Sequence, residues 1–513
     1  MLTLILPDLV LIVAGSALLL LGAFAKPAAR KIAPVVALAA LVGAIVVQVL
    51  LAPGGAIGVA LGGAVRITQL SIYIKLVTAL MGGVLVLMAW PSRANAAGNE
   101  SLDLGDDGGE FFGLALLSLA GVFLVSGADD TILLLLALEL VSIPTYIMVS
   151  ISRPLPAAQE AGVKYFFLGA MAAALMLFGF SYLYGTTGTV RLSQMGPALQ
   201  GALGQPSPWQ MMGVLVLLAG FAFKIAAVPL HFYVGDVYEG AATPVTAFLA
   251  FVPKISGFVA IIKVLGVVAG PQWLMPISIV KLLWVLAVLT MTVGNVLALL
   301  QHNVKRVLAY SSVAHSGYML VGLAALAGAA DAGSRLDALR AVLFYIAGYG
   351  LMNAAAFMVL MLLPARQSSE PATTAETYED LAGTGRQNLG LGLAMAVACF
   401  SLIGIPLTVG FLGKLLLIKP ALAGGSGSLV WLAIITVVNA AISAAYYLRI
   451  VGAMFLRPQP QWTSSNPTPR AIFPLRLALG LAVAGTLVLG SVPPAAQILW
   501  QLCEMGALAA SIR

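Results

Sequence analysis

The stretch GFAFKIAAVPLHFYVGDVYEG (220–240) has a lysine in the middle of an apolar run and a proline where a helix would be expected to continue. Pro229 has no amide hydrogen to donate, and its ring clashes with the carbonyl group of Ile225, four residues earlier. We therefore predict a helix that is broken beside Lys224. The composition of the whole chain decides whether such a break lies in water or in lipid.

Hydrophobic residues make up 61% of the 513 residues and charged residues only 9%, and the mean hydropathy is +1.03. A globular chain carries about 25% charged residues, so most of this chain must lie in lipid. The formal net charge of +7 comes from dispersed basic residues, which predicts orientation in a membrane rather than a nucleic-acid partner. Cys399 and Cys503 are far apart and form no CxxC motif, so a disulfide framework, an iron–sulfur cluster and a zinc site are not expected.

Fourteen apolar runs are long enough, at about 20 residues, to cross a bilayer as helices. The first is followed by Ala-Lys-Pro and is expected to be a retained span rather than a cleaved signal peptide. The Gly-rich run 52–70 is expected to be a loop, and 364–388 is the longest polar linker. We predict an all-α, polytopic membrane protein that forms a single integral domain over 1–513. The runs lie near 3–23, 33–51, 72–90, 111–127, 131–150, 161–184, 210–231, 242–267, 275–300, 304–328, 338–363, 389–418, 428–456 and 472–500.

The basic residues of the connecting loops predict the orientation, because cytoplasmic loops carry an excess of lysine and arginine. If the N-terminus is outside, the odd-numbered loops hold twelve of these residues, and the even-numbered loops together with the C-terminus hold six. We therefore expect both termini on the non-cytoplasmic side. The twelve are Lys26, Arg30, Lys31, Arg93, Arg153, Lys305, Arg306, Arg366, Arg386, Arg457, Arg470 and Arg476, and the six are Arg66, Arg191, Arg335, Arg340, Lys419 and Arg513.

Eight basic residues lie inside the predicted spans, where a charge costs about 2.5–3.5 kcal/mol or more. Four of them are close enough to a span end for a long side chain to extend to the interface, and a structural role is expected for these: Lys75, Lys263, Lys281 and Arg449. Lys164 is also inside a span. The remaining three, Lys224, Lys254 and Lys414, have apolar sequence on both sides, which favours a functional role. Among the acids, we place only Glu139 well inside a span, in LLLLALELVSIPTY (133–146).

One buried glutamate among several buried lysines indicates proton chemistry. A lysine whose carboxylate neighbour moves closer or further away can be made to bind and release a proton. An anion pathway would be expected to use arginine, which does not deprotonate. A site for a large organic substrate would be expected to show more aromatic and amide groups near these lysines.

A second interrupted run, SLIGIPLTVGFLGKLLLI (401–418), places Gly404, Pro406 and Gly410 just before Lys414. Broken helices at membrane depth occur where they line protein or water-filled cavities, and they place helix ends near bound ions. The two broken runs are each the fourth of five, in the fourth to eighth runs and in the ninth to thirteenth. This order predicts two inverted five-helix repeats, 111–267 and 275–456, with three helices before them (3–90) and one after them (472–500).

Three blocks, FKIAAVPLHFYVGDVYEGAATPVTAFLAFVPK (223–254), VKRVLAYSSVAHSGYML (304–320) and GIPLTVGFLGK (404–414), resemble the proton-translocating, antiporter-like subunits of respiratory complex I and of Mrp-type cation/proton antiporters. The resemblance covers nearly the whole chain. Three features favour one complex I subunit type: the opening ILPDLVLIVAGSALLLLGAF (5–24), a lysine rather than a glutamate at 414, and no long lateral helix after residue 500. The chain departs from the family in HFYVGDVYEG (231–240), where a tryptophan and an Ala-Pro more often precede the aspartate, and this bears on the shape of that loop.

The resemblance implies roles for the buried charges. Glu139 and Lys224 look like the input pair, and Lys164 resembles the lysine that modulates this pair. Lys254 looks like the central relay lysine, and Lys414 like the lysine of the second half-channel. Of the three histidines, His315 lies within a predicted span and is the best candidate to join the pathway, while His231 and His302 are weaker candidates.

The chain has no GxGxxG or GxxxxGK[ST] motif, and its histidines lack metal-ligand spacing, so no nucleotide, flavin, iron–sulfur or metal site is expected on it. The resemblance implies that NADH, FMN, iron–sulfur clusters and quinone are bound by partner subunits. The expected partners are the other membrane-arm subunits of complex I and membrane lipid, with the quinone pool acting indirectly. The expected location is the inner (plasma) membrane.

The mechanism that follows is electrostatic proton pumping, in which quinone reduction elsewhere in the complex alters the Glu139–Lys224 interaction. The alternative is a subunit of an Mrp-type Na⁺/H⁺ antiporter or of a related membrane-bound hydrogenase, and the genes next to this one would discriminate between them. A membrane scaffold that only tethers the complex is a third possibility, but a scaffold has no use for the buried lysines.

Overall fold

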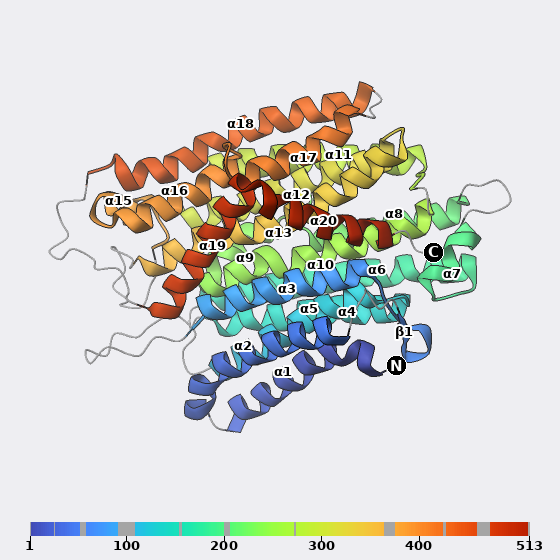
Figure 1. Ribbon diagram of the computed structural model, residues 1–513, viewed down its shortest axis with the longest axis horizontal. Coiled ribbons are helices and arrows are strands. Elements are labelled where there is room, and N and C mark those ends of the chain that lie inside the picture. The colour runs from blue at the N-terminus through green and yellow to red at the C-terminus, as the bar shows by residue number, and fades with distance from the viewer. Residues whose placement is uncertain are drawn as a thin grey trace.

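The computed structural model describes residues 2–24, 26–51, 58–90, 108–152, 156–199, 206–270, 273–363, 375–423, 427–458 and 472–510. Its long helices lie side by side along the long axis of the molecule, as Figure 1 shows. The N-terminal helices are α1 (Leu6–Phe24), which follows a short 3-10 helix (Leu2–Ile5), α2 (Lys26–Leu51) and α3 (Gln69–Met88).

Seven helices follow in the first of the two predicted repeats. They are α4 (Gly108–Gly127), α5 (Thr131–Ile151), α6 (Pro156–Thr187), α7 (Leu192–Leu199), α8 (Pro208–Lys224), α9 (Val234–Gly240) and α10 (Thr243–Ala269). The second predicted repeat contains α11 (Ile277–Leu299), α12 (Val304–Gly328), α13 (Ala332–Leu362), α14 (Tyr378–Leu381), α15 (Thr384–Gln387), α16 (Leu389–Ile403), α17 (Val409–Ala423) and α18 (Gly427–Phe455). The chain continues into α19 (Phe473–Ser491) and α20 (Pro493–Ala510).

Polar caps fix where several of these helices begin. Asp130 accepts hydrogen bonds from the amides of Ile132 and Leu133 at the start of α5, and Asn303 caps α12 in the same way. At the start of α8, Ser207 and Gln210 form a reciprocal capping box around Pro208. Such caps satisfy the free amides of a first helical turn, and they lie at the ends of the bundle, where the chain leaves the apolar layer.

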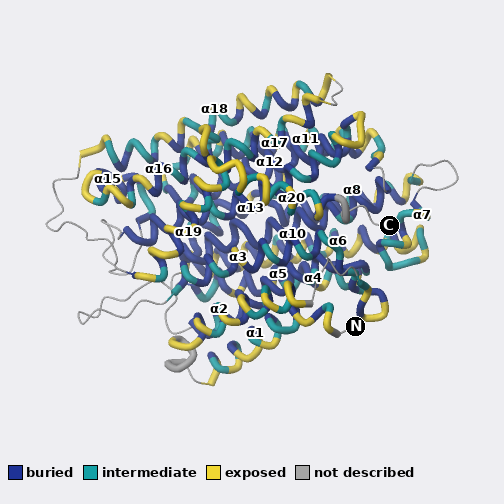
Figure 2. Tube along the Cα trace, viewed as in Figure 1, coloured by how far each residue is buried: buried dark blue, intermediate teal, exposed yellow. Residues whose placement is uncertain are grey.

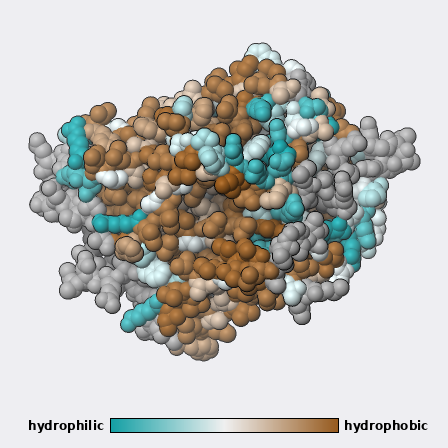
Figure 3. Space-filling view, viewed as in Figure 1, coloured by the Kyte–Doolittle hydropathy of each residue, from teal (hydrophilic) through white to brown (hydrophobic). Residues whose placement is uncertain are grey.

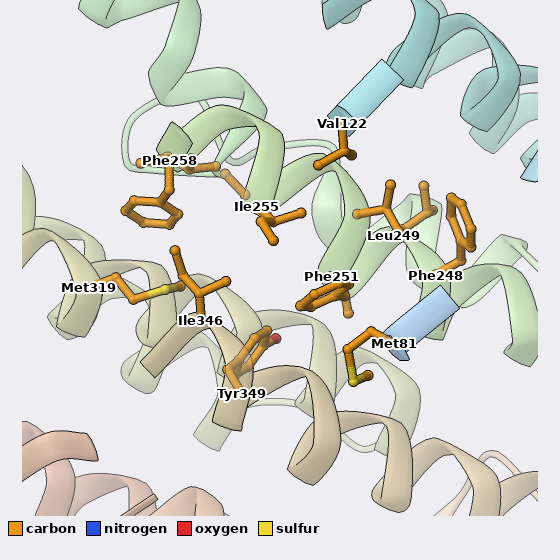
Figure 4. Packing of buried hydrophobic residues seen from close by; sticks show 14 of the residues in the cluster. Met81, Val122, Phe248, Leu249, Phe251, Ile255, Phe258, Met319, Ile346 and Tyr349 are labelled. Atoms are coloured by element: carbon orange, nitrogen blue, oxygen red, sulfur yellow. The ribbon is translucent and has the colours of Figure 1, made fainter. Parts of the chain in front are cut away.

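The centre of the molecule is built from α10, α12 and α13, which are buried along almost their whole length. In Figure 2 the buried residues fill the middle of the bundle, and exposed residues are frequent on the outer helices α1, α2 and α18. The core between the central helices is apolar where Phe251 and Ile255 of α10 lie opposite Ile346 and Tyr349 of α13, with Met81 of α3 beside them (Figure 4). Charges in this core are therefore confined to a few places.

Within the described residues, twelve helices are long and apolar enough to cross a membrane, and α8 and α16 are shorter apolar helices. Large hydrophobic side chains are exposed on the outer faces, for example Phe167 and Leu177 on α6 and Val437 on α18. Hydrophobic residues cover most of the coloured part of the face seen in Figure 3. The protein is thus a multi-pass, all-α integral membrane protein, as the sequence predicts.

The last predicted span, 472–500, is wrong in its extent, because it combines two helices. α19 ends at Ser491, and α20 begins at Pro493. The proline ring cannot continue a helix but fits the first turn of a new one. α20 then packs on α3, where the Cys503 thiol lies 3.3 Å from the Tyr73 hydroxyl.

The described part of the Gly-rich run 52–70 is also more ordered than predicted. Strands β1 (Gly58–Ala60) and β2 (Val65–Ile67) form a small antiparallel hairpin, in which Val59 pairs with Arg66. Gly62 and Gly63 have positive φ angles of 64° and 100°, which glycine adopts readily, and they make the turn. Val65 and Ile67 alternate into a small apolar cluster with Ile5, a pattern that indicates a half-buried strand.

The start of the 3-10 helix (Leu2–Ile5) and the end of α20 lie at the same end of the bundle, together with β1 and α7 (Figure 1). This arrangement requires an even number of crossings. Fourteen crossings result if α16 and α17 count as one broken span and α19 and α20 as another.

Candidate functional site: a row of buried lysines

The first pair of the site joins α5 to the end of α8. The Lys224 ammonium lies 3.0 Å from Glu139 Oε1 and donates a 2.6 Å hydrogen bond to Ser142 Oγ. Lys224 is 4% exposed, whereas the Glu139 side chain retains 21% of its exposure. The structure therefore brings together the two residues that were predicted as the input pair. Ser142 was not predicted, although it lies one helical turn after Glu139.

The predicted break beside Lys224 is confirmed, because this lysine is the last residue of α8. The helix ends five residues before Pro229, in a turn where Ala226 has a φ of 56°. The Val228 amide is satisfied outside the helix by a 3.1 Å hydrogen bond to Thr290 Oγ1. A helix C-terminus carries partial negative charge, so the backbone itself favours a cation at this position.

Lys254 lies in the middle of α10 and is almost fully buried. Its ammonium donates to the carbonyl oxygen of Ser312 in α12 and lies over the Tyr349 ring, 5.6 Å from its centroid. In the part of the chain that the structure describes, Lys254 has no carboxylate within ion-pair distance. It therefore meets only a carbonyl dipole and an aromatic face, both of which attract a cation without neutralising it.

Gly257 brings α10 close to the break after Lys224. A Cβ atom at this position would lie 2.7 Å from Ile225 Cγ2 and 3.1 Å from Lys224 Cβ. Gly257 is one helical turn after Lys254. Its close contact therefore places α10, the helix that carries Lys254, directly against Lys224 and the residue after it.

His315, on α12, lies in a ring of tyrosines. Its Nδ1 is 2.7 Å from the Tyr345 hydroxyl and its Nε2 is 3.1 Å from the Tyr447 hydroxyl. A neutral imidazole both donates and accepts, so hydroxyl groups on both sides can form a continuous hydrogen-bonded path. Ser312, which binds Lys254, lies one turn before the histidine.

Lys414 is held by the end of the other broken helix. Its ammonium donates 2.8 Å hydrogen bonds to the carbonyl oxygens of Leu402 and Ile403, in the last turn of α16. Gly404 ends that helix with a φ of 93°, so the predicted second break is confirmed. The ammonium also lies 4.5 Å from the centroid of the Tyr318 ring, which in turn contacts His315 edge-on. Lys414 thus belongs to the same polar centre as His315.

Lys164 lies apart from this row. Its side chain is 43% exposed on α6 and forms ion pairs with Glu160 at 2.7 Å and with Asp236 at 2.9 Å. Among the described residues, it makes no hydrogen bond or ion pair with Glu139 or Lys224.

Two other buried lysines differ from the sequence prediction. Lys75 does not extend to the interface, because it is 1% exposed and pairs with Asp8 of α1 at 2.5 Å. Asp8 is therefore a second deeply buried acid, which its position near the start of the first apolar run concealed. Lys305, predicted in a loop, is fully buried at the start of α12 and pairs with Glu376 at 3.0 Å.

The remaining basic residues and histidines lie away from the row. Lys281 is exposed, and Lys263 donates to the carbonyl oxygen of Ala128 at 2.5 Å. Arg449 lies over the Tyr378 ring at 4.3 Å and is 3.5 Å from His302. His231 lies 3.2 Å from the carbonyl oxygen of Pro229. Within the described ranges, no three His, Cys, Asp or Glu residues are grouped so that they could hold a metal ion.

The family model of the NADH:quinone oxidoreductase/Mrp antiporter transmembrane region matches residues 128–443, which include every residue of the row. NADH-quinone oxidoreductase subunit N of Trichlorobacter lovleyi is 37% identical over 493 residues, which cover 96% of this chain and 94% of the relative. A chain in the structure of respiratory complex I from Thermus thermophilus with bound aureothin is 30% identical, with a TM-score of 0.75 and coverage of 98% of this chain and 100% of that chain.

A chain of the Mrp complex from Dietzia sp. has the same fold, with a TM-score of 0.79 at 20% identity over 98% of this chain and 97% of that chain. At this identity the similarity concerns the fold alone. The predicted resemblance to one complex I subunit type is confirmed by the relatives with the higher identities. The chain belongs to the NADH:quinone oxidoreductase/Mrp antiporter transmembrane family, in the branch formed by the N subunits of NADH-quinone oxidoreductase.

Proposed function

We propose that this protein is a proton-translocating subunit in the membrane arm of an NADH:quinone oxidoreductase. In this proposal the protons move along Glu139, Lys224, Lys254, His315 and Lys414. The observation that carries the proposal is the ion pair of Glu139 with Lys224, at the point where α8 stops inside the bundle. A lysine that can gain and lose its only carboxylate partner can gain and lose a proton.

The first step is set by the partners of Lys224. While Glu139 is 3.0 Å away, the ammonium is neutralised and its proton is held. When a change at the subunit interface draws the partly exposed carboxylate away, an unpaired cation remains in an apolar interior, which is costly. The proton then leaves Nζ and moves through water to a neutral Lys254, which lies on the helix that contacts the break.

The later steps use the polar groups already described, with water between them. Lys254 passes its proton through water to His315, which lies one turn after Ser312, and the imidazole takes up a proton on one nitrogen and releases one from the other. The hydroxyl of Tyr345 or Tyr447 continues the path. Lys414 receives the proton beside the carbonyl groups that end α16 and releases it to the exit.

The finer features belong to the same proposal. NADH, FMN, iron–sulfur clusters and quinone are bound by partner subunits, and the other membrane-arm subunits and lipid surround this chain. The protein lies in the inner membrane, with both termini on the non-cytoplasmic side. Residues 111–267 and 275–456 are two inverted repeats, and the interruption of a helix beside a buried lysine in each of them, at Lys224 and at Lys414, supports this division.

The test is proton pumping by the intact complex, purified with this subunit and reconstituted in liposomes. NADH-driven acidification and electron transfer are measured together, with and without Na⁺. We expect the Lys224→Met complex to assemble normally but to lose acidification. Wild-type acidification by that variant would exclude Lys224 as a carrier, and Na⁺ uptake in place of acidification would favour the antiporter alternative.

A further inference from the structure

Asp236 lies between two cations that belong to different halves of the molecule. Its Oδ2 is 2.9 Å from Lys164 Nζ on α6, and its Oδ1 is 3.1 Å from Arg306 NH1 on α12. Asp236 itself is on α9, the short helix that follows the break after Lys224. The Lys164 ammonium, helped by Arg306, holds the pKa of the Asp236 carboxyl below its usual range, so this residue is ionised at neutral pH.

The side of α9 that faces α12 is fixed by further contacts. Arg306 NH1 lies 2.6 Å from Glu239 Oε2, and Asn303 donates to Glu239 Oε1 at 3.2 Å. A Cβ atom at Gly235 would lie 2.6 Å from the Tyr310 hydroxyl, so this side chain of α12 packs directly on the backbone of α9. On the side of α9 that faces α6, Lys164 forms an ion pair with Asp236.

An aromatic contact connects this junction to Lys224. Tyr165, the residue after Lys164, stacks on Tyr233 with ring centroids 5.1 Å apart and planes within 12°. Tyr233 is the residue directly before α9, and its hydroxyl donates to the carbonyl oxygen of Phe223 at 2.9 Å. Phe223 precedes Lys224. A shift of α9 against α6 must therefore move the end of α8.

We propose that Asp236 is the positioning residue through which Lys164 acts on Lys224. In this view Lys164 does not adjust the Glu139–Lys224 pair by its own electric field. It holds α9 against α6, and α9 holds the end of α8 through Tyr233. Arg306 shares the same carboxylate, so the position of α9 also depends on α12, the helix that carries His315. The inference rests on the proposed proton path, because its effect is read at Lys224.

The experiment is a double-substitution series in the reconstituted complex, with protons pumped per electron pair as the readout. Lys164→Met, Asp236→Asn and the double variant are compared at equal amounts of assembled complex. The expected result is that Asp236→Asn causes the same loss as Lys164→Met, and that the double variant loses no more than either alone. Asp236→Glu keeps the carboxylate and is expected to restore most of the ratio, which a purely structural role would not explain.

Glu160→Gln is the matched control. Glu160 also binds Lys164, but it is on the same helix and is 66% exposed, so it cannot transmit a force to α9, and wild-type pumping is expected. A double variant that pumps clearly less than either single variant would overturn the inference, since Lys164 would then act without Asp236. Wild-type pumping by Asp236→Asn beside impaired pumping by Lys224→Met would refute this inference alone. Wild-type pumping by Lys224→Met itself would refute both the proposed path and the inference.

Discussion

The ammonium of Lys224 lies 3.0 Å from a carboxylate oxygen of Glu139, and the lysine is the residue at which α8 ends. The described partners of the ammonium are therefore a charged carboxylate and the neutral hydroxyl of Ser142. The carboxylate is on another helix and is partly exposed, and in the proposed mechanism it is the partner that a neighbouring subunit moves. This division of partners leads to the first two predictions.

Glu139→Gln is expected to lower the number of protons pumped per electron pair while the complex still assembles. The amide keeps the size of the side chain but removes the charge that holds the proton on Lys224. NADH-driven acidification in liposomes, normalised to electron transfer, measures the effect. If an assembled Glu139→Gln complex pumps normally, the input pair has no part in the mechanism.

Lys224→Arg and Lys224→Met together separate a proton carrier from a fixed positive charge. Arginine keeps the charge but does not release its proton in proteins, so a carrier fails in both variants and a fixed charge fails only in Lys224→Met. We expect failure in both, and the same pattern at Lys414. Because the arginine fork is larger, assembly and thermal stability are measured beside pumping. Wild-type pumping by an intact Lys224→Arg complex would contradict the carrier role.

Gly257→Ala is expected to reduce pumping with electron transfer less affected. The added methyl group would lie 2.7 Å from Ile225 Cγ2, so α10 must move away from the broken end of α8 and from Lys224. Gly480→Ala, at a helical glycine with no atom within 4 Å of the new methyl group, is the control. Equal pumping by the two variants would show that the close contact is not required.

The pair formed by Asp8 and Lys75 is expected to affect stability rather than pumping. Asp8→Asn leaves a buried ammonium unpaired, which typically costs about 3–5 kcal/mol, so less assembled complex and a lower melting temperature are expected. In Asp8→Asn/Lys75→Met no charge remains, and most of the loss should be recovered. Melting of the detergent-solubilised complex measures this. A double variant as unstable as Asp8→Asn would show that the pair is not the cause.

Both termini are expected on the non-cytoplasmic side of the membrane. The two-to-one excess of basic residues in the odd-numbered loops is the reason, and the shared end of the bundle requires that the two termini agree. Reporter fusions at residues 1 and 513 measure it. A cytoplasmic signal from both ends would reverse the orientation, and opposite signals would mean an odd number of crossings.

The features that could be predicted from the sequence are those with local causes. Pro229, Gly404 and Pro406 lie in the short segments between two helices and prevent a continuous helix there, so both breaks can be predicted, and apolar flanks on both sides single out Lys224 and Lys414. The features that were missed depend on distant segments. Lys75 is buried because Asp8 lies opposite, and the two tyrosines that bind the His315 ring nitrogens come from α13 and α18, which the spacing of residues cannot bring together.

The two broken helices also differ in the partners that they give to their lysines. At Lys414 the described negative partners are peptide carbonyls, whose strength is constant throughout a cycle. At Lys224 one partner is a carboxylate that can approach and withdraw. In the proposed path, the electrostatic partner of the lysine therefore changes at one end of the row and stays the same at the other. The signal from the rest of the complex then acts at Lys224, and no movement is required at Lys414.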